Sequence, residues 1–216
     1  MRPAVPLALG LLLILPGVAL PARSASSAVP SADAPAAAAR PEPGPDCTEC
    51  PHWEAPAHLT DRMTIAPASE PGARLMLEGT VFKSDGKTPA PDVLLYAYHT
   101  NAQGHYAHGP SATGQGRWHG DLRGWLRTGA DGRYRIETIR PAPYPGRTIP
   151  AHIHMHVMAP GGRERSIDDV VFDDDPLVTG TWRTRAENID GSGLVHLERD
   201  VAGVLHGRRD IVLPAE

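Results

Sequence analysis

The chain has 216 residues, a length that fits one domain with short appendages. Hydrophobic residues make up 41% of the chain and charged residues 21%, as in ordinary globular proteins, and long stretches of helical periodicity are absent. The net charge of −4 at pH 7 argues against a surface that binds nucleic acid.

Residues 1–25 have the form of a secretory signal peptide, in which Arg2 precedes an apolar run from Leu7 to Leu15 and small residues follow. A membrane-spanning helix needs about 20 apolar residues, so we expect no membrane span after cleavage and an exported protein, secreted or periplasmic. An uncleaved anchor is the alternative. Residues 26–46 are rich in alanine, proline and serine, which predicts a disordered linker.

The two cysteines, Cys47 and Cys50, form a C-T-E-C motif directly after this linker. Because the oxidised state is expected in an exported protein, the motif favours a small disulfide loop. A redox motif fits less well, since proline-rich sequence precedes it and Pro51 follows it. A zinc site would need two further ligands, for which His52 and His58 are the nearby candidates.

Short strands alternate with turn signals from residue 74 to residue 216, which predicts an all-β fold, a β-sandwich of mostly antiparallel strands with long functional loops. Asp85-Gly86 and Asp131-Gly132 supply the positive φ angles of hairpin turns. Residues 47–73 are expected to form a separate N-terminal segment that contains a short helical turn near residues 58–66. The expected strands are 74–82, 93–98, 125–128, 134–138, 151–158, 170–172, 194–198 and 210–213.

The residues best suited to metal binding or catalysis lie in Y-P-G-R-T-I-P-A-H-I-H-M-H, from Tyr144 to His156. His152, His154 and His156 alternate with apolar residues, so one face of a strand presents imidazoles and the other face is apolar. Imidazole suits zinc, copper, iron and nickel. A phenolate oxygen is a harder donor, so a tyrosine beside a histidine pair favours ferric iron over zinc. The alternative is a solvated strand face with Tyr144 in the core.

Four sequence blocks follow one another along the chain: Y-H-T-N-A-Q-G-H-Y (98–106), T-G-A-D-G-R-Y (128–134), T-I-R-P-A-P-Y-P (138–145) and P-A-H-I-H (150–154). In this order and spacing, the region from about residue 77 to residue 175 resembles the intradiol ring-cleavage dioxygenases, the family of the protocatechuate and catechol dioxygenases. The resemblance implies a β-sandwich, in agreement with the predicted strands. It also implies an oxidoreductase that uses O2 to open a catechol ring between its two hydroxyl-bearing carbons, giving a cis,cis-muconate-type product.

The resemblance further implies a non-haem Fe(III) cofactor, held by two tyrosines and two histidines. By position these ligands are Tyr106, Tyr144, His152 and His154. Tyr144 and His154 match the axial pair of the family, and Tyr144 is in addition expected to act in catalysis by leaving the metal and taking a proton. His156 has no ligand counterpart and is expected to be a polar strand residue or a hydrogen-bond donor beside the site.

Two positions depart from the family pattern. The family commonly has an arginine three residues before the first histidine; here that position is Ile149, and Arg147 is the candidate replacement as a second catalytic residue. The family's downstream glutamine corresponds to Asp169. Loss of a preorganised positive group can cost orders of magnitude in rate. We therefore expect retained iron binding, with less support for efficient cleavage of a carboxylated catechol such as protocatechuate.

Three functions remain under consideration. The first is an exported Fe(III) intradiol dioxygenase whose partners are a small catecholic substrate and O2, with a homodimer left open. The second is an exported metal- or aromatic-binding β-sandwich that has lost turnover, which Ile149 and Asp169 keep open. The third is a structural or carbohydrate-binding sandwich, against which the four retained ligands argue. The acidic run of residues 173–175 is expected to be a turn rather than a calcium site.

Overall fold

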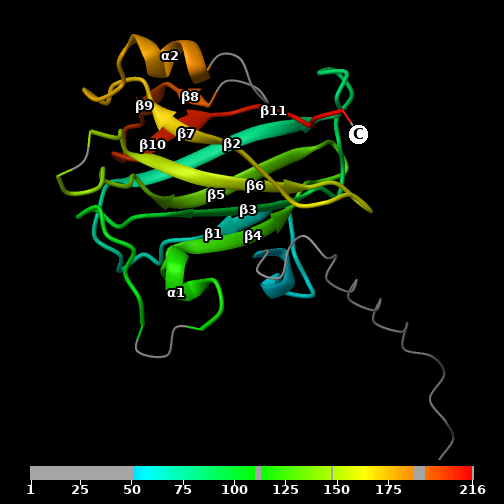
Figure 1. Cartoon of the computed structure of the whole chain (residues 1–216), viewed down its shortest axis with the longest axis horizontal. Helices are drawn as coiled ribbons and strands as arrows, with labels where there is room; N and C mark the ends of the chain where they lie inside the picture. The colour runs from blue at the N-terminus through cyan, green and yellow to red at the C-terminus, as the bar shows by residue number, and fades with distance from the viewer. Residues whose placement is uncertain (1–50, 110–112, 147, 187–192, 216) are drawn as a thin grey trace, which may run out of the picture. The chain divides into compact units, whose positions relative to one another are not determined.

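Two β-sheets form the framework of the computed structural model, which describes residues 51–109, 113–146, 148–186 and 193–215 (Figure 1). The predicted all-β sandwich class is therefore confirmed. The expected signal peptide, the linker and the cysteine motif lie outside the described residues, as does Arg147. None of the described helices is both long and apolar enough to cross a membrane.

The secondary-structure elements are short and are joined by turns and loops. The helices are η1 (Pro51–Glu54), α1 (Gly116–His119) and α2 (Gly180–Ala186). The strands are β1 (Arg62–Thr64), β2 (Arg74–Phe82), β3 (Leu94–His99), β4 (Arg123–Arg127), β5 (Arg133–Ile139), β6 (His152–Met158), β7 (Arg165–Phe172), β8 (Leu194–Val195), β9 (Leu197–Arg199), β10 (Leu205–Arg208) and β11 (Ile211–Val212).

The first sheet has the strand order β1-β5-β2-β10-β9, with β11 also paired to β2, and the second has the order β4-β3-β6-β7-β8. The antiparallel pairs are β2–β5, β9–β10, β3–β4, β3–β6 and β6–β7. The parallel pairs are β1–β5, β2–β10, β2–β11 and β7–β8. The strand β6 lies between β3 and β7 inside the second sheet (Figure 1). Its backbone is thus held on both sides by hydrogen-bonded neighbours.

Both predicted turns are present, since Gly86 has φ +67 and Gly132 has φ +73, as tight turns require. At Gly86 the chain forms a short hairpin: Lys83 N–H donates to Thr88 O at 2.8 Å, Ala90 N–H donates to Val81 O at 2.8 Å, and Phe82 bridges Pro89. The predicted pairing of the longer flanking strands is wrong, because β2 and β3 belong to different sheets, and so do β4 and β5. A turn fixes only the local chain reversal, whereas burial of each strand's apolar face decides its partner. β2 instead pairs with β5, from Arg74↔Ile139 to Thr80↔Arg133.

The helical turn expected near residues 58–66 is also wrong. This region contains β1, which pairs in parallel with β5 from Arg62↔Arg135 to Thr64↔Glu137. Met63 and Ile65 are buried in the core, so the segment follows the alternation of a strand. Three residues are too few for that period to stand out in the sequence.

The core fixes which way the histidines of β6 point. Ile153, Met155 and Val157 are buried between the two sheets. Successive side chains on a strand face opposite sides, so His152, His154 and His156 lie on the other face of the second sheet. The apolar residues of the H-I-H-M-H-V run thereby anchor the strand while the imidazoles remain available for chemistry.

Candidate metal centre

Four side chains that are far apart in the sequence converge on the outer face of β6. Tyr106 comes from the loop after β3, Tyr144 from the connection between β5 and β6, and His152 and His154 from β6 itself. The Tyr106 Oη atom lies 2.5 Å from Tyr144 Oη and 3.0 Å from His154 Nε2. The His152 Nε2 atom lies 3.1 Å from both Tyr144 Oη and His154 Nε2, and the last two are 3.3 Å apart. The structure thus brings together all four residues that the sequence predicts as ligands.

Close packing of two loops places the tyrosines side by side. Gly104 has φ +80, and a Cβ atom there would lie 2.1 Å from the carbonyl oxygen of Pro143. Glycine therefore satisfies both the backbone angle and the close approach. The Thr100 hydroxyl donates to Ala142 O at 2.7 Å, and Ala142 N–H donates to Asn101 O at 3.1 Å. These contacts join the Tyr106 loop to the Tyr144 loop.

The hydrogen bonds of the two imidazoles define which ring nitrogen faces the cluster. His152 Nδ1 lies 2.7 Å from the carbonyl oxygen of Pro150, which can only accept, so this nitrogen donates. His154 Nδ1 lies 2.8 Å from Asp169 Oδ1 and donates to that carboxylate. Burial lowers the pKa of His152, which favours its neutral ring. In the neutral rings each Nε2 then carries a lone pair, and these two lone pairs meet at 3.1 Å.

The tyrosines supply few protons to this cluster. Burial raises the pKa of Tyr106, and its hydrogen bond with Tyr144 acts in the same direction, so without a cation the phenol stays protonated. Two phenolic protons are then shared among four converging oxygen and nitrogen atoms that are all able to accept. A metal ion between them would meet hard phenolate and imidazole donors, so the residues present fit ferric iron.

Asp169 supports the cluster from the far side of His154. Burial opposes ionisation of this carboxyl group, but the hydrogen bond from His154, together with the charges of His154, His152 and Arg209, holds the pKa of Asp169 below its ordinary value. His152, His154 and Asp169 also form a group of potential metal ligands. We assign Asp169 to orientation rather than ligation, because it contacts Nδ1 whereas the tyrosines face Nε2 of the same ring.

The register of β6 against β7 explains why Asp169 lies beside His154. His152 pairs with Val171 and Ile153 with Val170, so the same register places Asp169 beside His154. A β-bulge follows, between Ile153 and Met155, and bulges commonly re-aim side chains next to functional sites. Cross-strand pairing of β6 with β7 would thus have identified Asp169 as a partner of His154.

Two stacked rings, those of Tyr98 and His119, lie beside His154. The Tyr98 ring stacks on His154 with centroids 4.5 Å apart and on His119 with centroids 3.7 Å apart. Burial raises the pKa of Tyr98 to about 12 and lowers the pKa of His119 to about 4, so both rings are neutral near pH 7. The register pairs Tyr98 with His154. Tyr98 begins the block of residues 98–106, but it is not among the predicted site residues.

His156 lies outside the cluster. Its Nδ1 atom is 2.7 Å from Glu164 Oε1, and the other oxygen of the same carboxylate is 2.6 Å from His52 Nδ1. The Glu164 side chain is only 4% exposed. Burial opposes its ionisation, but the hydrogen bonds from His156 and His52 lower the pKa of Glu164 below its ordinary value. His156 therefore joins η1 to the second sheet.

A cavity of about 530 Å³ opens beside the two tyrosines. Ile149, at the position where the family commonly has an arginine, contributes an apolar side chain to its wall. Arg147, the predicted replacement, cannot be placed here because it lies outside the described residues. The lining residues are Gly104, His105, Tyr106, Tyr144, Pro145 and Ile149.

The acidic run forms a turn in which its carboxylates have separate partners. Asp174 pairs with Arg140 through two contacts of 2.7 Å. Asp175 accepts a hydrogen bond from Ala151 N–H at 2.8 Å, and Asp173 lies 2.9 Å from His196, which is between β8 and β9. These contacts agree with the expected turn and fix the start of β6 next to the cluster.

Comparison with known proteins agrees with this geometry. A family model described as "Dioxygenase" matches residues 48–188. The chain is 31% identical over 166 residues to catechol 1,2-dioxygenase 1 of Acinetobacter lwoffii, covering 67% of this chain and 52% of that relative. It is 31% identical over 121 residues to the protocatechuate 3,4-dioxygenase beta chain of Burkholderia cepacia, covering 50% of this chain and 48% of the relative.

Solved structures show the same fold. Catechol 1,2-dioxygenase from Acinetobacter sp. ADP1, inhibited by bound mercury, aligns with a TM-score of 0.56 at 26% identity, over 71% of this chain and 57% of that one. The dioxygenase domain of a dioxygenase–carbohydrate-binding fusion from Streptomyces sp. SirexAA-E aligns with a TM-score of 0.53 at 28% identity, over 74% and 91%. The chain belongs to the intradiol ring-cleavage dioxygenase family. It spans about half the length of the curated relatives it matches.

Proposed function

We propose that this protein is a non-haem Fe(III) intradiol dioxygenase that cleaves a catechol-type ring with O2 to a cis,cis-muconate-type product. The observation that carries the proposal is the convergence of Tyr106, Tyr144, His152 and His154 at contacts of 2.5–3.3 Å. Because Nδ1 of each imidazole is turned to an oxygen acceptor, the two Nε2 atoms and the two phenolic oxygens face one another, and this donor set favours a cation. These four residues would hold the iron.

The residues of the site have distinct roles in the proposed reaction. When bound, ferric iron supplies Lewis acidity that favours the anionic form of both catechol oxygens and activates the ring towards O2. Tyr144 lines the cavity, and its Oη atom contacts Tyr106, His152 and His154. We assign to it the acceptance of a catechol proton. Asp169 keeps the His154 ring oriented, and the role of Arg147 remains a prediction.

The cavity wall favours an uncharged catechol as the substrate class. Ile149 and Pro145 add apolar surface beside Tyr144, and an apolar wall cannot compensate the desolvation of a carboxylate. We expect catechol to be cleaved with a higher kcat/KM than protocatechuate. Ile149→Arg should shift this ratio towards protocatechuate by about tenfold or more, the usual size of a new charge-assisted hydrogen bond. A ratio unchanged in Ile149→Arg would contradict this assignment of specificity.

The test of the function begins with purified protein that has no metal-binding tag. We expect about one iron per chain, as in a single-site metalloenzyme, together with a visible tyrosinate charge-transfer band that Tyr106→Phe and Tyr144→Phe each weaken. Addition of catechol in air should consume O2 and yield a muconate in which both added oxygen atoms come from O2. A protein that stays colourless after reconstitution with ferric iron would overturn the proposal.

A binding protein without turnover is the second candidate, and Ile149 is the observation that favours it. Such a protein would show the iron colour and a spectral shift with catechol but would consume no O2. Both candidates therefore predict bound iron, and a measurement of O2 consumption distinguishes between them.

We further propose that the protein is exported by residues 1–25. This proposal depends on the sequence pattern, since those residues are not among the described ones. N-terminal sequencing of protein recovered outside the cytoplasm should begin after residue 19. An intact Met1 in that fraction would favour the uncleaved anchor.

A further inference from the structure

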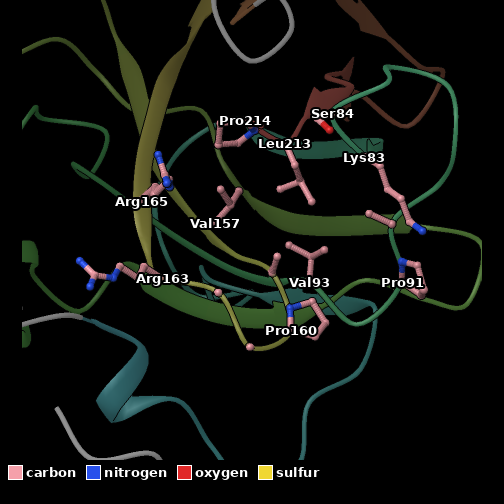
Figure 2. A pocket seen from close by; sticks show the side chains of 14 residues that line it. Lys83, Ser84, Pro91, Val93, Val157, Pro160, Arg163, Arg165, Leu213 and Pro214 are labelled. Atoms are coloured by element: carbon pink, nitrogen blue, oxygen red, sulfur yellow. The ribbon is translucent and has the colours of Figure 1, made fainter. Parts of the chain in front are cut away.

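A second cavity, with a volume of about 740 Å³, lies at the end of β6 away from the histidine cluster (Figure 2). Its size falls within the range of small-molecule sites, about 300–1,000 Å³. It opens where the two sheets meet, between the β2–β3 loop, the β6–β7 turn and the chain after β11. The lining residues are Lys83, Ser84, Ala90, Pro91, Val93, Val157, Ala159, Pro160, Gly161, Gly162, Arg163, Arg165, Leu213 and Pro214.

Arg165 is the first residue of β7 and is exposed at this end of the sandwich. It pairs with Val157 across the β6–β7 ladder, and paired residues of antiparallel strands point to the same face. Val157 is 2% exposed, and Ile167, two residues further along β7, is also buried. Arg165 therefore extends from the same face of the sheet as these apolar residues, but at the end of the strand, where it borders the cavity.

Two of the cations that line the cavity, Arg165 and Lys83, are exposed to solvent. Within the described part of the chain, neither of them forms an ion pair. The carboxylate of Asp85, on the same turn as Lys83, accepts hydrogen bonds from the backbone of Lys87 and from Thr88. Glu164, which precedes Arg165, contacts two histidines. Arg165 and Lys83 are therefore available to pair with an anionic ligand.

An apolar floor separates the cations. Val93 and Val157 are buried, and Leu213 lies beside them. Figure 2 shows Arg163 and Arg165 on one side of these three residues and Lys83 on the other. This arrangement complements an elongated molecule with an apolar middle and a negative charge at each end.

We propose that this cavity binds a small dicarboxylate whose two carboxylates are joined by an apolar linker. One carboxylate would pair with Arg165 at the start of β7, since guanidinium matches a carboxylate in two-point geometry. The other would meet Lys83, and the linker would cover Val93, Val157 and Leu213. A muconate-type product belongs to this chemical class, and only that link depends on the proposed dioxygenase function.

The experiment titrates adipate, a saturated six-carbon dicarboxylate, into the purified protein by isothermal calorimetry at low ionic strength. Wild-type protein should bind one adipate saturably. Arg165→Gln and Lys83→Gln should each weaken binding about tenfold or more, because each removes a charge-assisted contact. Lys87→Gln is the matched control, since Lys87 is exposed on the same loop as Lys83 but does not line the cavity, and it should bind as wild type does.

Two further measurements test whether the ligand needs both carboxylates and where on the protein it binds. Hexanoate, which has the same chain length but one carboxylate, should bind much more weakly than adipate; equal affinities would overturn the dicarboxylate assignment. Adipate binding should persist in His154→Ala. If His154→Ala abolished binding while Arg165→Gln and Lys83→Gln left it unchanged, the ligand would sit at the metal centre and the proposal would fail.

The outcome is independent of the proposed catalysis. Protein that lacks iron colour and turnover but binds adipate through Arg165 would support the cavity and overturn the dioxygenase. An active dioxygenase that binds no adipate at millimolar concentrations would support the enzyme and overturn the cavity.

Discussion

Two histidine–carboxylate pairs lie on the same face of β6 and differ in what surrounds them. His154 Nδ1 is 2.8 Å from Asp169, and His156 Nδ1 is 2.7 Å from Glu164. On the other ring nitrogen, His154 meets two tyrosine hydroxyls and His152. His156 instead has the rings of Tyr96 and Tyr98 as neighbours, at 5.7 and 6.2 Å.

The difference shows that the H-x-H-x-H pattern does not by itself select the metal ligands. Both pairs have the carboxylate–histidine arrangement that accompanies metal sites. Only at His154 do loops bring further donor atoms to the free ring nitrogen. The carboxylate of Glu164 is engaged by His52 as well, so that pair connects two segments of the chain. One strand thus carries a candidate metal ligand and, two residues later, a structural contact.

The largest expected effect separates the two histidines directly. His154→Ala should lose nearly all iron, because one of four donors disappears from a site whose other atoms are already short of protons. His156→Ala should retain iron at the wild-type stoichiometry. Elemental analysis of the purified proteins measures both, and the melting temperature with and without a chelator adds a second readout: chelation should lower it in His156→Ala but not in His154→Ala.

The reverse result, with iron retained in His154→Ala and lost in His156→Ala, would show that the ligand assignment is wrong. His152→Ala should behave as His154→Ala does. His152 and His154 are on one strand, so a shared folding defect must be excluded. Circular dichroism that matches wild type in both variants would exclude it.

A smaller effect is expected from the carboxylates. Asp169→Asn keeps a hydrogen-bond acceptor for His154 but removes the negative charge, and loss of such outer partners typically costs about 10–100-fold in metal affinity. Glu164→Gln makes the same change at His156 and should leave iron affinity unchanged. Competition with a coloured chelator measures both. Equal losses of iron affinity in the two variants would mean that the affinity depends on the overall charge near the site rather than on the contact between Asp169 and His154.

The sequence predicts the four side chains that cluster better than the residues that support them. Tyr106, Tyr144, His152 and His154 fall in blocks whose order and spacing resemble a known family, and alternation along β6 places the histidines on one face. Asp169 appeared only as a departure from the family pattern. Its contact with His154 depends on the register of β6 against β7 and on the bulge that ends this register, which are tertiary features.

The fold shows the same division between local and tertiary information. Strand periodicity predicts β2, β3, β5 and β6 to within one residue at each end. The turns at Gly86 and Gly132 have the predicted backbone, but which sheet each following strand joins depends on how the apolar faces pack. Turn chemistry contains no information about that packing, so the sheets that β3 and β5 join could not be predicted from the turns before them.

The smallest effect concerns the structural pair and its pH dependence. The pKa of Glu164 is lower in the folded protein than its ordinary value of 4.5. The carboxylate therefore contributes stability that is fully present above pH 4.5 and is lost as the pH falls through the lower folded pKa. Glu164→Gln should cost about 1–2 kcal/mol at pH 5, the size of hydrogen bonds to a buried charge.

The difference in unfolding free energy between wild type and Glu164→Gln should then shrink from pH 5 to pH 3, because wild type also loses its charge there. Urea denaturation at several pH values measures it. His52→Ala is the companion variant, since it removes one partner of the same carboxylate without touching β6. A difference that grows on acidification would mean that the protonated carboxyl, rather than the carboxylate, is the form that stabilises the contact between η1 and the second sheet.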